Sequence, residues 1–241
     1  MGKKLKYTGF AIGFILLFLI VTVKFVEDDS WNSWNLPLSG KIIILDAGHG
    51  GPDGGANVQS ALEKEIALKV TFKIRDFLQE QGALVIMTRE DDSDLADENT
   101  KGIRNRKRQD LQNRVKMIND SEADLFLSVH LNAFPSSQWK GAQTFYTRRY
   151  EENEQVAKFI QAEIKRNLEN TNREAKLIDN VYLMRNAKKP GALVEVGFLS
   201  NSEDRANLLK EPYQEKISAS VFKGVLRYFT EEKLTDNEYK P

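Results

Sequence analysis

Cysteine is absent from the 241-residue chain, and histidine occurs only twice, at His49 and His130. The first absence excludes disulfides, thiolate zinc sites and a cysteine nucleophile, and the second restricts imidazole chemistry to two positions. Net charge is also lacking, because 35 Lys and Arg balance 35 Asp and Glu. No overall field therefore attracts a polyanion, and we expect no nucleic-acid partner.

The remaining composition is that of a globular protein. With 41% hydrophobic and 29% charged residues the chain can bury a sizeable core, which excludes bulk disorder, collagen and a long coiled coil. Its length allows one ordinary domain plus an appendage.

One long apolar run lies near the N-terminus. No charged residue occurs from Tyr7 to Val23, and the stretch approaches the roughly 20 residues that a spanning helix needs. Lysines precede the run and acidic residues follow it, so the positive-inside rule places the N-terminus in the cytoplasm. We interpret residues 1–27 as a cytoplasmic stub and transmembrane anchor, with a cleaved signal peptide as the main alternative and a buried core helix as a lesser one. The anchor and the signal peptide both predict an extracytoplasmic protein, either membrane-anchored or secreted.

The rest of the chain divides into a linker, a core domain and a tail. Residues 28–40 are polar and contain Pro37 and Gly40, as linkers do, whereas residues 232–241 form a polar tail. In residues 41–231, apolar runs alternate with helical patterns, which predicts an α/β fold with a largely parallel sheet between helices. The expected strands are Lys41–Asp46, Ala83–Thr88, Asp124–His130, Ala142–Thr147, Val181–Met184 and Ala192–Val196. The expected helices are Glu63–Gln81, Arg106–Asn119, Glu151–Glu169, Ser202–Lys210 and Tyr213–Phe229.

A long polar segment of mixed charge, Glu90–Arg108, separates the second expected strand from the next helix. We interpret it as a surface loop. Its basic run, Lys101–Arg108, is typical of a solvated face, and contact with an anionic polymer is the alternative.

Both histidines follow or end an expected strand. His49 lies in the glycine-rich stretch LDAGHGGPDGG, where the backbone can turn sharply and leave the imidazole accessible. This stretch lacks the spacing of a phosphate-binding loop. His130 ends the run DLFLSVH. Sites in open α/β sheets gather at the carboxyl ends of strands, so the two positions together favour a site over two structural histidines.

Two carboxylates, Glu63 and Glu195, lie at apolar positions where an unpaired charge is costly. At 100° per residue, Glu63 points along the apolar face of its helix, while Glu65 lies on the opposite side. A catalytic zinc with an open fourth position is commonly held by two histidines and a carboxylate. A helix N-terminal carboxylate that favours the macrodipole is the alternative for Glu63. Glu195 interrupts the apolar strand ALVEVGF and beside a metal would serve as general base; a structural ion pair is its alternative.

Four motifs occur together in order: DAGHGG, LEKEIAL, SVHLNA and VEVGFLSN. With them the chain resembles the zinc-dependent N-acetylmuramoyl-L-alanine amidases of bacterial cell walls, the amidase-3 family, over about residues 41–230. The resemblance implies that residues 41–231 are a zinc amidase catalytic domain with a mixed six-stranded sheet. It also implies Zn²⁺ as cofactor, His49, Glu63 and His130 as its ligands, and Glu195 as the catalytic carboxylate.

The same resemblance implies a substrate and a setting. The substrate is peptidoglycan, cleaved between the lactyl group of muramic acid and L-alanine. Chain length, the apolar N-terminal run and the lack of a wall-binding repeat make the chain most similar to the spore-cortex amidases of spore-forming bacteria. That subgroup implies a role in germination, through muramic δ-lactam formation, and a location between the forespore membranes. Any activating protein partner stays unidentified.

Three further expectations concern this chain's own features. Some members of the family carry an inhibitory helix after the second histidine motif, but here Leu131–Lys140 is too short for one. Arg89 and Arg114 are expected to form structural salt bridges. The alternatives to the amidase are a zinc peptidase acting on the stem peptide and a non-catalytic, membrane-anchored wall-binding protein.

Overall fold

The structure is a computed structural model, and it describes residues 7, 10, 12–20 and 36–230. The chain divides into two units, Met1–Leu36 and Pro37–Pro241. Most of the predicted anchor and linker, and the predicted polar tail, lie outside the described residues. Within the described ranges, no helix is both long and apolar enough to cross a membrane. The anchor therefore stays a prediction.

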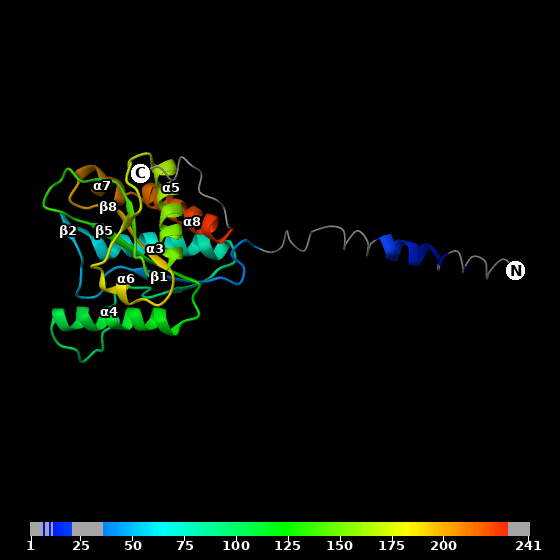
Figure 1. Cartoon of the computed structure of the whole chain (residues 1–241), viewed down its shortest axis with the longest axis horizontal. Coiled ribbons are helices and arrows are strands. Elements are labelled where there is room, and N and C mark those ends of the chain that lie inside the picture. Colours follow the sequence, from blue (N-terminus) through cyan, green and yellow to red (C-terminus); the bar gives the residue numbers. More distant parts are fainter. Residues whose placement is uncertain (1–6, 8–9, 11, 21–35, 231–241) are drawn as a thin grey trace. The chain divides into compact units, whose positions relative to one another are not determined.

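A six-stranded sheet forms the centre of the second unit (Figure 1). Its strand order is β4-β1-β5-β8-β6-β7, and all neighbours are parallel except β6 and β8, which run antiparallel. The predicted α/β class with a mixed, largely parallel sheet is confirmed. The strands are β1 (Ile42–Ala47), β4 (Leu84–Met87), β5 (Leu125–Asn132), β6 (Gln143–Tyr146), β7 (Lys176–Leu177) and β8 (Gly191–Phe198). A small hairpin pairs β2 (Asn57–Val58) with β3 (Ala61–Leu62).

Helices cover both faces of this sheet. On one face pack α3 (Glu63–Glu80), α5 (Glu151–Leu168) and α8 (Glu211–Phe229), and on the other lie α4 (Ile103–Asp120) and α6 (Tyr182–Asn186). The short helix α7 (Ser202–Leu208) follows β8. Alternation along the strands produces this division, because successive side chains point to opposite faces. On β5, for example, Leu125 and Leu127 join the larger core, whereas Phe126 joins the smaller one.

One predicted strand is wrong. The run Val181–Met184 lies mostly in helix α6, and the sixth strand is instead the two-residue β7. A short apolar run cannot be assigned to strand or helix from periodicity alone. Here Leu183 and Met184 are both buried against the sheet, which a helix of one turn allows and a strand with one solvent-exposed face does not.

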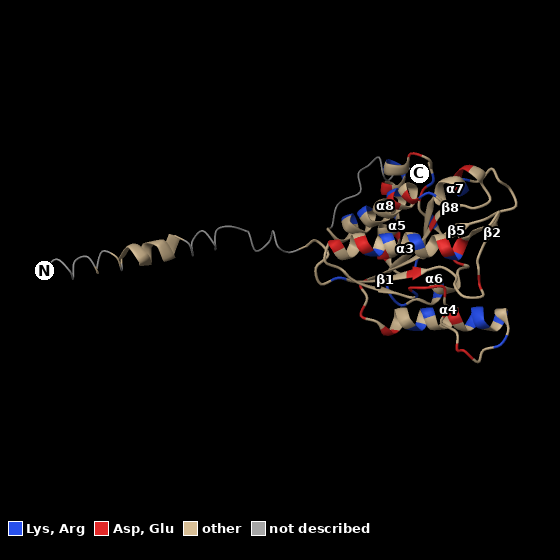
Figure 2. Cartoon of the chain, turned by 180° about the vertical axis from the view of Figure 1, so that it is seen from behind, with Lys and Arg blue, Asp and Glu red and all other residues tan. Residues whose placement is uncertain are grey.

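The predicted loop Glu90–Arg108 is shorter than expected, because α4 already begins at Ile103. The basic run therefore occupies mainly the first turns of a helix, where Figure 2 shows Lys and Arg side by side. Arg104, Lys107 and Arg108 are exposed there, as a solvated face requires. The connection from β5 to β6, all of it described, contains no helix, as its length predicts.

Candidate active site

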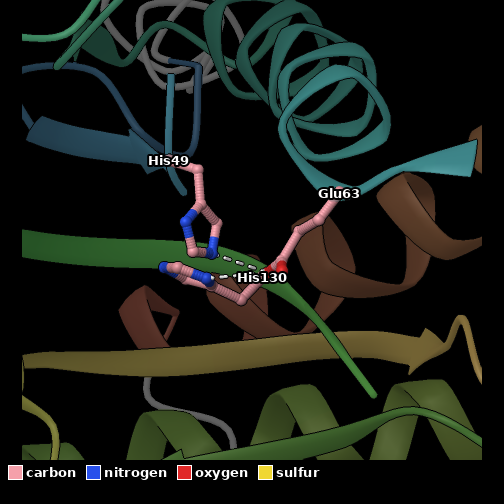
Figure 3. Close-up of side chains that lie close together, drawn as sticks. All are labelled: His49, Glu63 and His130. Carbon is pink, nitrogen blue, oxygen red and sulfur yellow. Dashed lines mark hydrogen bonds and ion pairs between the residues drawn. The ribbon is translucent and has the colours of Figure 1, made fainter. Parts of the chain in front are cut away.

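His49, Glu63 and His130 converge at the carboxyl ends of β1 and β5 (Figure 3). His49 lies in the loop after β1, Glu63 is the first residue of α3, and His130 belongs to β5. Glu63 Oε1 lies 3.1 Å from His49 Nε2 and 3.0 Å from His130 Nδ1. One ligand atom from each residue lies within 4.8 Å of the other two. The three predicted ligands are thus aimed at one point.

The backbone of His49 is held in an unusual conformation. Its φ of 61° lies in the left-handed region, which costs a residue other than glycine about 1–2 kcal/mol. Arg114 Nη2 donates a 2.6 Å hydrogen bond to the His49 carbonyl oxygen, and Arg89 Nη2 donates a 2.9 Å hydrogen bond to that of Gly48. Two buried arginines therefore stabilise the turn that directs this imidazole inward.

Two glycines are required by close approach. A Cβ on Gly48 would lie 2.4 Å from the His130 ring, and a Cβ on Gly55 would lie 2.5 Å from Glu63 Oε2. Gly55 also has a φ of 65°, which disfavours any side chain. The glycine-rich loop thus lets the three predicted ligands approach its backbone closely, in addition to turning the chain.

Asp53 orients His49. Asp53 Oδ2 lies 2.8 Å from His49 Nδ1 and 3.0 Å from Lys107 Nζ on α4. Such a carboxylate partner fixes the tautomer that leaves Nε2 free for a metal. Burial alone would lower the pKa of His49, but hydrogen bonds to Asp53 and Glu63, and their charges, raise it to about 9. Asp53 is not among the residues predicted from the sequence.

Glu63 is buried, with 4% of its surface exposed, while Glu65 is exposed. The predicted inward direction of Glu63 is therefore observed. Its two oxygens accept hydrogen bonds from the backbone amides of Leu131 and Ala56, at 2.9 and 2.8 Å. Burial raises the pKa of Glu63, but hydrogen bonds to the two histidines and their charges outweigh it and hold the pKa well below its ordinary value.

Glu195 lies on β8, one strand away from the predicted ligand His130 on β5. It is the register partner of His130 across the β5–β8 pair. Among the described residues, no hydrogen-bond partner reaches its buried Oε2 atom, and the charged groups that act on it are His130, Glu63 and His49, with no Lys or Arg. Burial, and less strongly the charge of Glu63, raise the pKa of Glu195 to about 7, although both histidines act to lower it. The structural ion pair proposed as its alternative role is absent from the described part of the chain.

The two predicted arginines differ in their contacts. Arg114 forms the expected salt bridges, at 2.7 Å to Asp46 and 2.9 Å to Asp110, and all three side chains are buried. Arg89 instead donates to backbone carbonyl oxygens, including those of Ala47, Gly48 and Lys64. Both therefore anchor the loop after β1.

The segment that follows Arg89 also contacts the glycine-rich loop. Asp92 accepts hydrogen bonds from the Gly51 amide at 2.9 Å and from Lys64 Nζ at 2.6 Å. The first part of the polar segment is therefore packed against the site.

The donor set fits a zinc ion. Two imidazole nitrogens and one carboxylate oxygen, with room for a fourth ligand, are the set found in many catalytic zinc sites. Glu63 lies within hydrogen-bonding distance of both histidines, and a metal would bind these groups in their deprotonated forms. The orphaned Glu195 oxygen nearby is the kind of group that a reacting water can satisfy.

Comparison with known proteins agrees with this geometry. The chain matches the Amidase_3 family, described as N-acetylmuramoyl-L-alanine amidase, over residues 43–227. It is 60% identical over 231 residues to the germination-specific N-acetylmuramoyl-L-alanine amidase of Bacillus subtilis, covering 96% of this chain and 98% of that one.

Solved structures show the same similarity. The CwlD amidase of Clostridioides difficile, solved in complex with the GerS lipoprotein, superposes with a TM-score of 0.77 at 44% identity, covering 80% of this chain and all of that one. An N-acetylmuramoyl-L-alanine amidase of Clostridium difficile 630 superposes with a TM-score of 0.70 at 25% identity, covering 80% and 98%.

Proposed function

Because the chain belongs to the Amidase_3 family and is an N-acetylmuramoyl-L-alanine amidase of peptidoglycan, we propose a catalytic arrangement for it. His49, Glu63 and His130 bind a zinc ion, and Glu195 carries the proton. The observation that supports this proposal most is the convergence of three ligand atoms near Glu195, whose buried Oε2 atom has no hydrogen-bond partner among the described residues. The family membership disfavours the stem-peptide peptidase and the non-catalytic wall-binding protein.

The reaction adds water to the lactyl carbonyl and breaks its bond to the alanine nitrogen. A zinc ion at these ligands would supply Lewis acidity, polarising the carbonyl and making the attacking water easier to deprotonate. Glu195 accepts the proton of that water as the C–O bond forms. It then donates the proton to the alanine nitrogen as the C–N bond breaks, leaving a lactyl carboxylate and a free peptide amine.

The pKa of Glu195 suits both halves of this task. A general base is most effective when its pKa lies near the working pH, and that of Glu195 is raised to about 7 by burial. A cation at the three ligands would lower this pKa, since a nearby positive charge favours the ionised form. Glu195 would then be ionised before the reaction, as a base must be.

Two further parts of the proposal concern biological setting. A germination-specific amidase is 60% identical to this chain, which supports a role in preparing spore-cortex peptidoglycan for muramic δ-lactam formation. Peptidoglycan lies outside the cytoplasm, so we place the domain of this chain outside the cytoplasm, either held by the predicted anchor or secreted. Cortex from spores that lack the protein should contain no muramic δ-lactam, and normal lactam content would remove this role.

A lipoprotein partner is also part of the proposal, because the similar CwlD amidase was solved as a complex with one. Full turnover of peptidoglycan by the purified chain alone would remove this requirement.

A matched pair of variants tests the metal assignment. Glu63→Gln should lose most bound zinc, whereas Glu65→Gln, two residues away on the exposed side of the same helix, should keep it. Zinc content and muropeptide release are measured on the same preparations, with products identified by mass spectrometry. Freed lactyl ends and intact peptides that begin with L-alanine support the amidase. Zinc bound equally by both variants would remove Glu63 from the site.

A further inference from the structure

A row of side chains crosses the sheet from the proposed metal ligands to an arginine. His130 on β5 is in register with Glu195 on β8, and Glu195 is in register with Gln143 on β6. Residues directly opposite on neighbouring strands share a face, so these side chains lie on one face of the sheet. Gln143 Oε1 then accepts a 3.1 Å hydrogen bond from Arg173 Nη1. The row therefore ends at a guanidinium group.

Arg173 is held rigidly, yet part of it stays available. Its Nε donates a 3.0 Å hydrogen bond to the Lys140 carbonyl oxygen. The guanidinium also lies over two rings, 5.5 Å from the centroid of Trp139 and 5.0 Å from that of Phe198. Its second terminal nitrogen, Nη2, has no hydrogen-bond partner among the residues that the structure describes. An arginine fixed in this way can donate to a carboxylate with little further loss of side-chain entropy.

This arginine lines an open cavity of about 550 Å³ in the surface. Trp139, Lys140 and Asn172 also line it, and Glu169 is the one acidic side chain in the lining. Trp139 is 47% exposed, which leaves much of its indole available for contact. Lys140 is paired with Glu203 at 3.0 Å. The cavity thus combines the Arg173 guanidinium, side-chain amides and an exposed aromatic ring, and these suit a polar ligand that carries a carboxylate.

Arg173 lies just beyond the strand next to Glu195. Gln143 is one strand from Glu195, which is about 5 Å between Cα atoms, and its side chain contacts Arg173, whereas two extended peptide residues span about 7 Å. In the stem peptide, L-alanine is followed by D-glutamate linked through its γ-carboxyl group. The free α-carboxylate of that second residue is therefore the first anion beyond the scissile amide.

We propose that Arg173 is a specificity-determining residue that binds the α-carboxylate of the second stem residue while the amide lies between His130 and Glu195. The inference rests on the proposed roles of those two residues. It assigns the Arg173 cavity to the departing peptide, so an amidated second residue should be a poor substrate.

Two soluble muropeptides that differ in one group provide the test. Both are disaccharide peptides, and the second stem residue is D-glutamate in one and its α-amide in the other. The zinc-loaded full chain should cleave the acid with about tenfold higher kcat/KM, the usual worth of a hydrogen bond to a charged group. Most of the difference should lie in KM. Equal kcat/KM for the two substrates would overturn the proposal without any variant.

Variants of Arg173 then test whether this residue causes the preference for the acid over the amide. Arg173→Gln should lose the roughly tenfold advantage on the acid and leave the amide unchanged, and Arg173→Lys should restore part of it. Arg75→Gln is the matched control, because Arg75 also stacks on an aromatic ring and lies twelve residues along α3 from Glu63. Equal losses on both substrates would assign Arg173 a structural role instead. No cleavage of either substrate by the wild-type chain, even with the partner lipoprotein present, would instead refute the proposed function.

Discussion

The buried ion pair of Arg114 carries a prediction about the stability of the site. The Arg114 side chain is 1% exposed and that of Asp46 is 2% exposed. Arg114→Met would remove the cation and leave two carboxylates, Asp46 and Asp110, buried. Loss of one partner of a buried pair costs about 3–5 kcal/mol, and the His49 carbonyl would also lose its 2.6 Å donor. For a domain of this size, a loss of that order lowers Tm by roughly 6–20 °C.

Thermal unfolding in the presence of a chelator measures this effect without interference from metal binding. The matched control is Lys116→Met on the same helix, because the Lys116–Asp120 pair is exposed and worth at most about 1 kcal/mol. Adding Asp46→Asn to Arg114→Met should recover part of the loss, since it removes one of the uncompensated charges. If Arg114→Met does not fold, Arg114→Lys should still melt well below the wild type. A Tm within about 2 °C of the wild type for Arg114→Met would refute this reasoning.

Three other predictions follow from the site. Glu195→Gln should keep near-normal zinc while turnover of peptidoglycan falls by about 10² to 10⁴, the usual worth of a positioned general base; substantial remaining turnover would assign the proton transfer elsewhere. The folded-state pKa of Glu195, about 7, lies above its ordinary 4.5, so ionisation is disfavoured in the fold and metal-free protein should lose stability as pH rises between these values. Glu195→Gln should lack this loss. An equal change in unfolding free energy between pH 4.5 and pH 8 for the two proteins would contradict the prediction. Gly48→Ala should displace the His130 ring and weaken zinc binding. Gly54→Ala is the control and should not, because its Cβ would meet only Leu62, at 3.8 Å. Equal zinc affinities of the two variants would show that the loop shifts to accommodate the added methyl group.

The parts of the site that were predictable depend on local patterns. The inward direction of Glu63 follows from the 100° step of one helix, and the placement of His49 and His130 follows from their positions at the ends of apolar strands. Both patterns involve residues close together in the sequence, so no knowledge of long-range contacts was needed.

The contacts that were not predicted join distant residues or lie in irregular backbone. Asp46 and Arg114 are 68 residues apart, and no periodicity relates them. Asp53 lies in a loop four residues after His49, and outside a helix this spacing does not predict that two side chains meet. The sixth strand, β7, has only two residues, Lys176 and Leu177, both exposed, so no apolar pattern marks it.

The reversed direction of β6 has a consequence for how this fold can diversify. Because β6 runs antiparallel to its neighbour β8, the connection from Asn132 to Gln143 both leaves and re-enters the sheet at the edge where the proposed ligands converge. Closing a flexible loop costs only about 0.6 kcal/mol more for each doubling of its length. Insertions at this point can therefore be accommodated without changing the strand order, and each would lie at the edge of the sheet that carries the proposed ligands. The connection is thus a position where new control elements can be gained or lost while the rest of the domain stays the same.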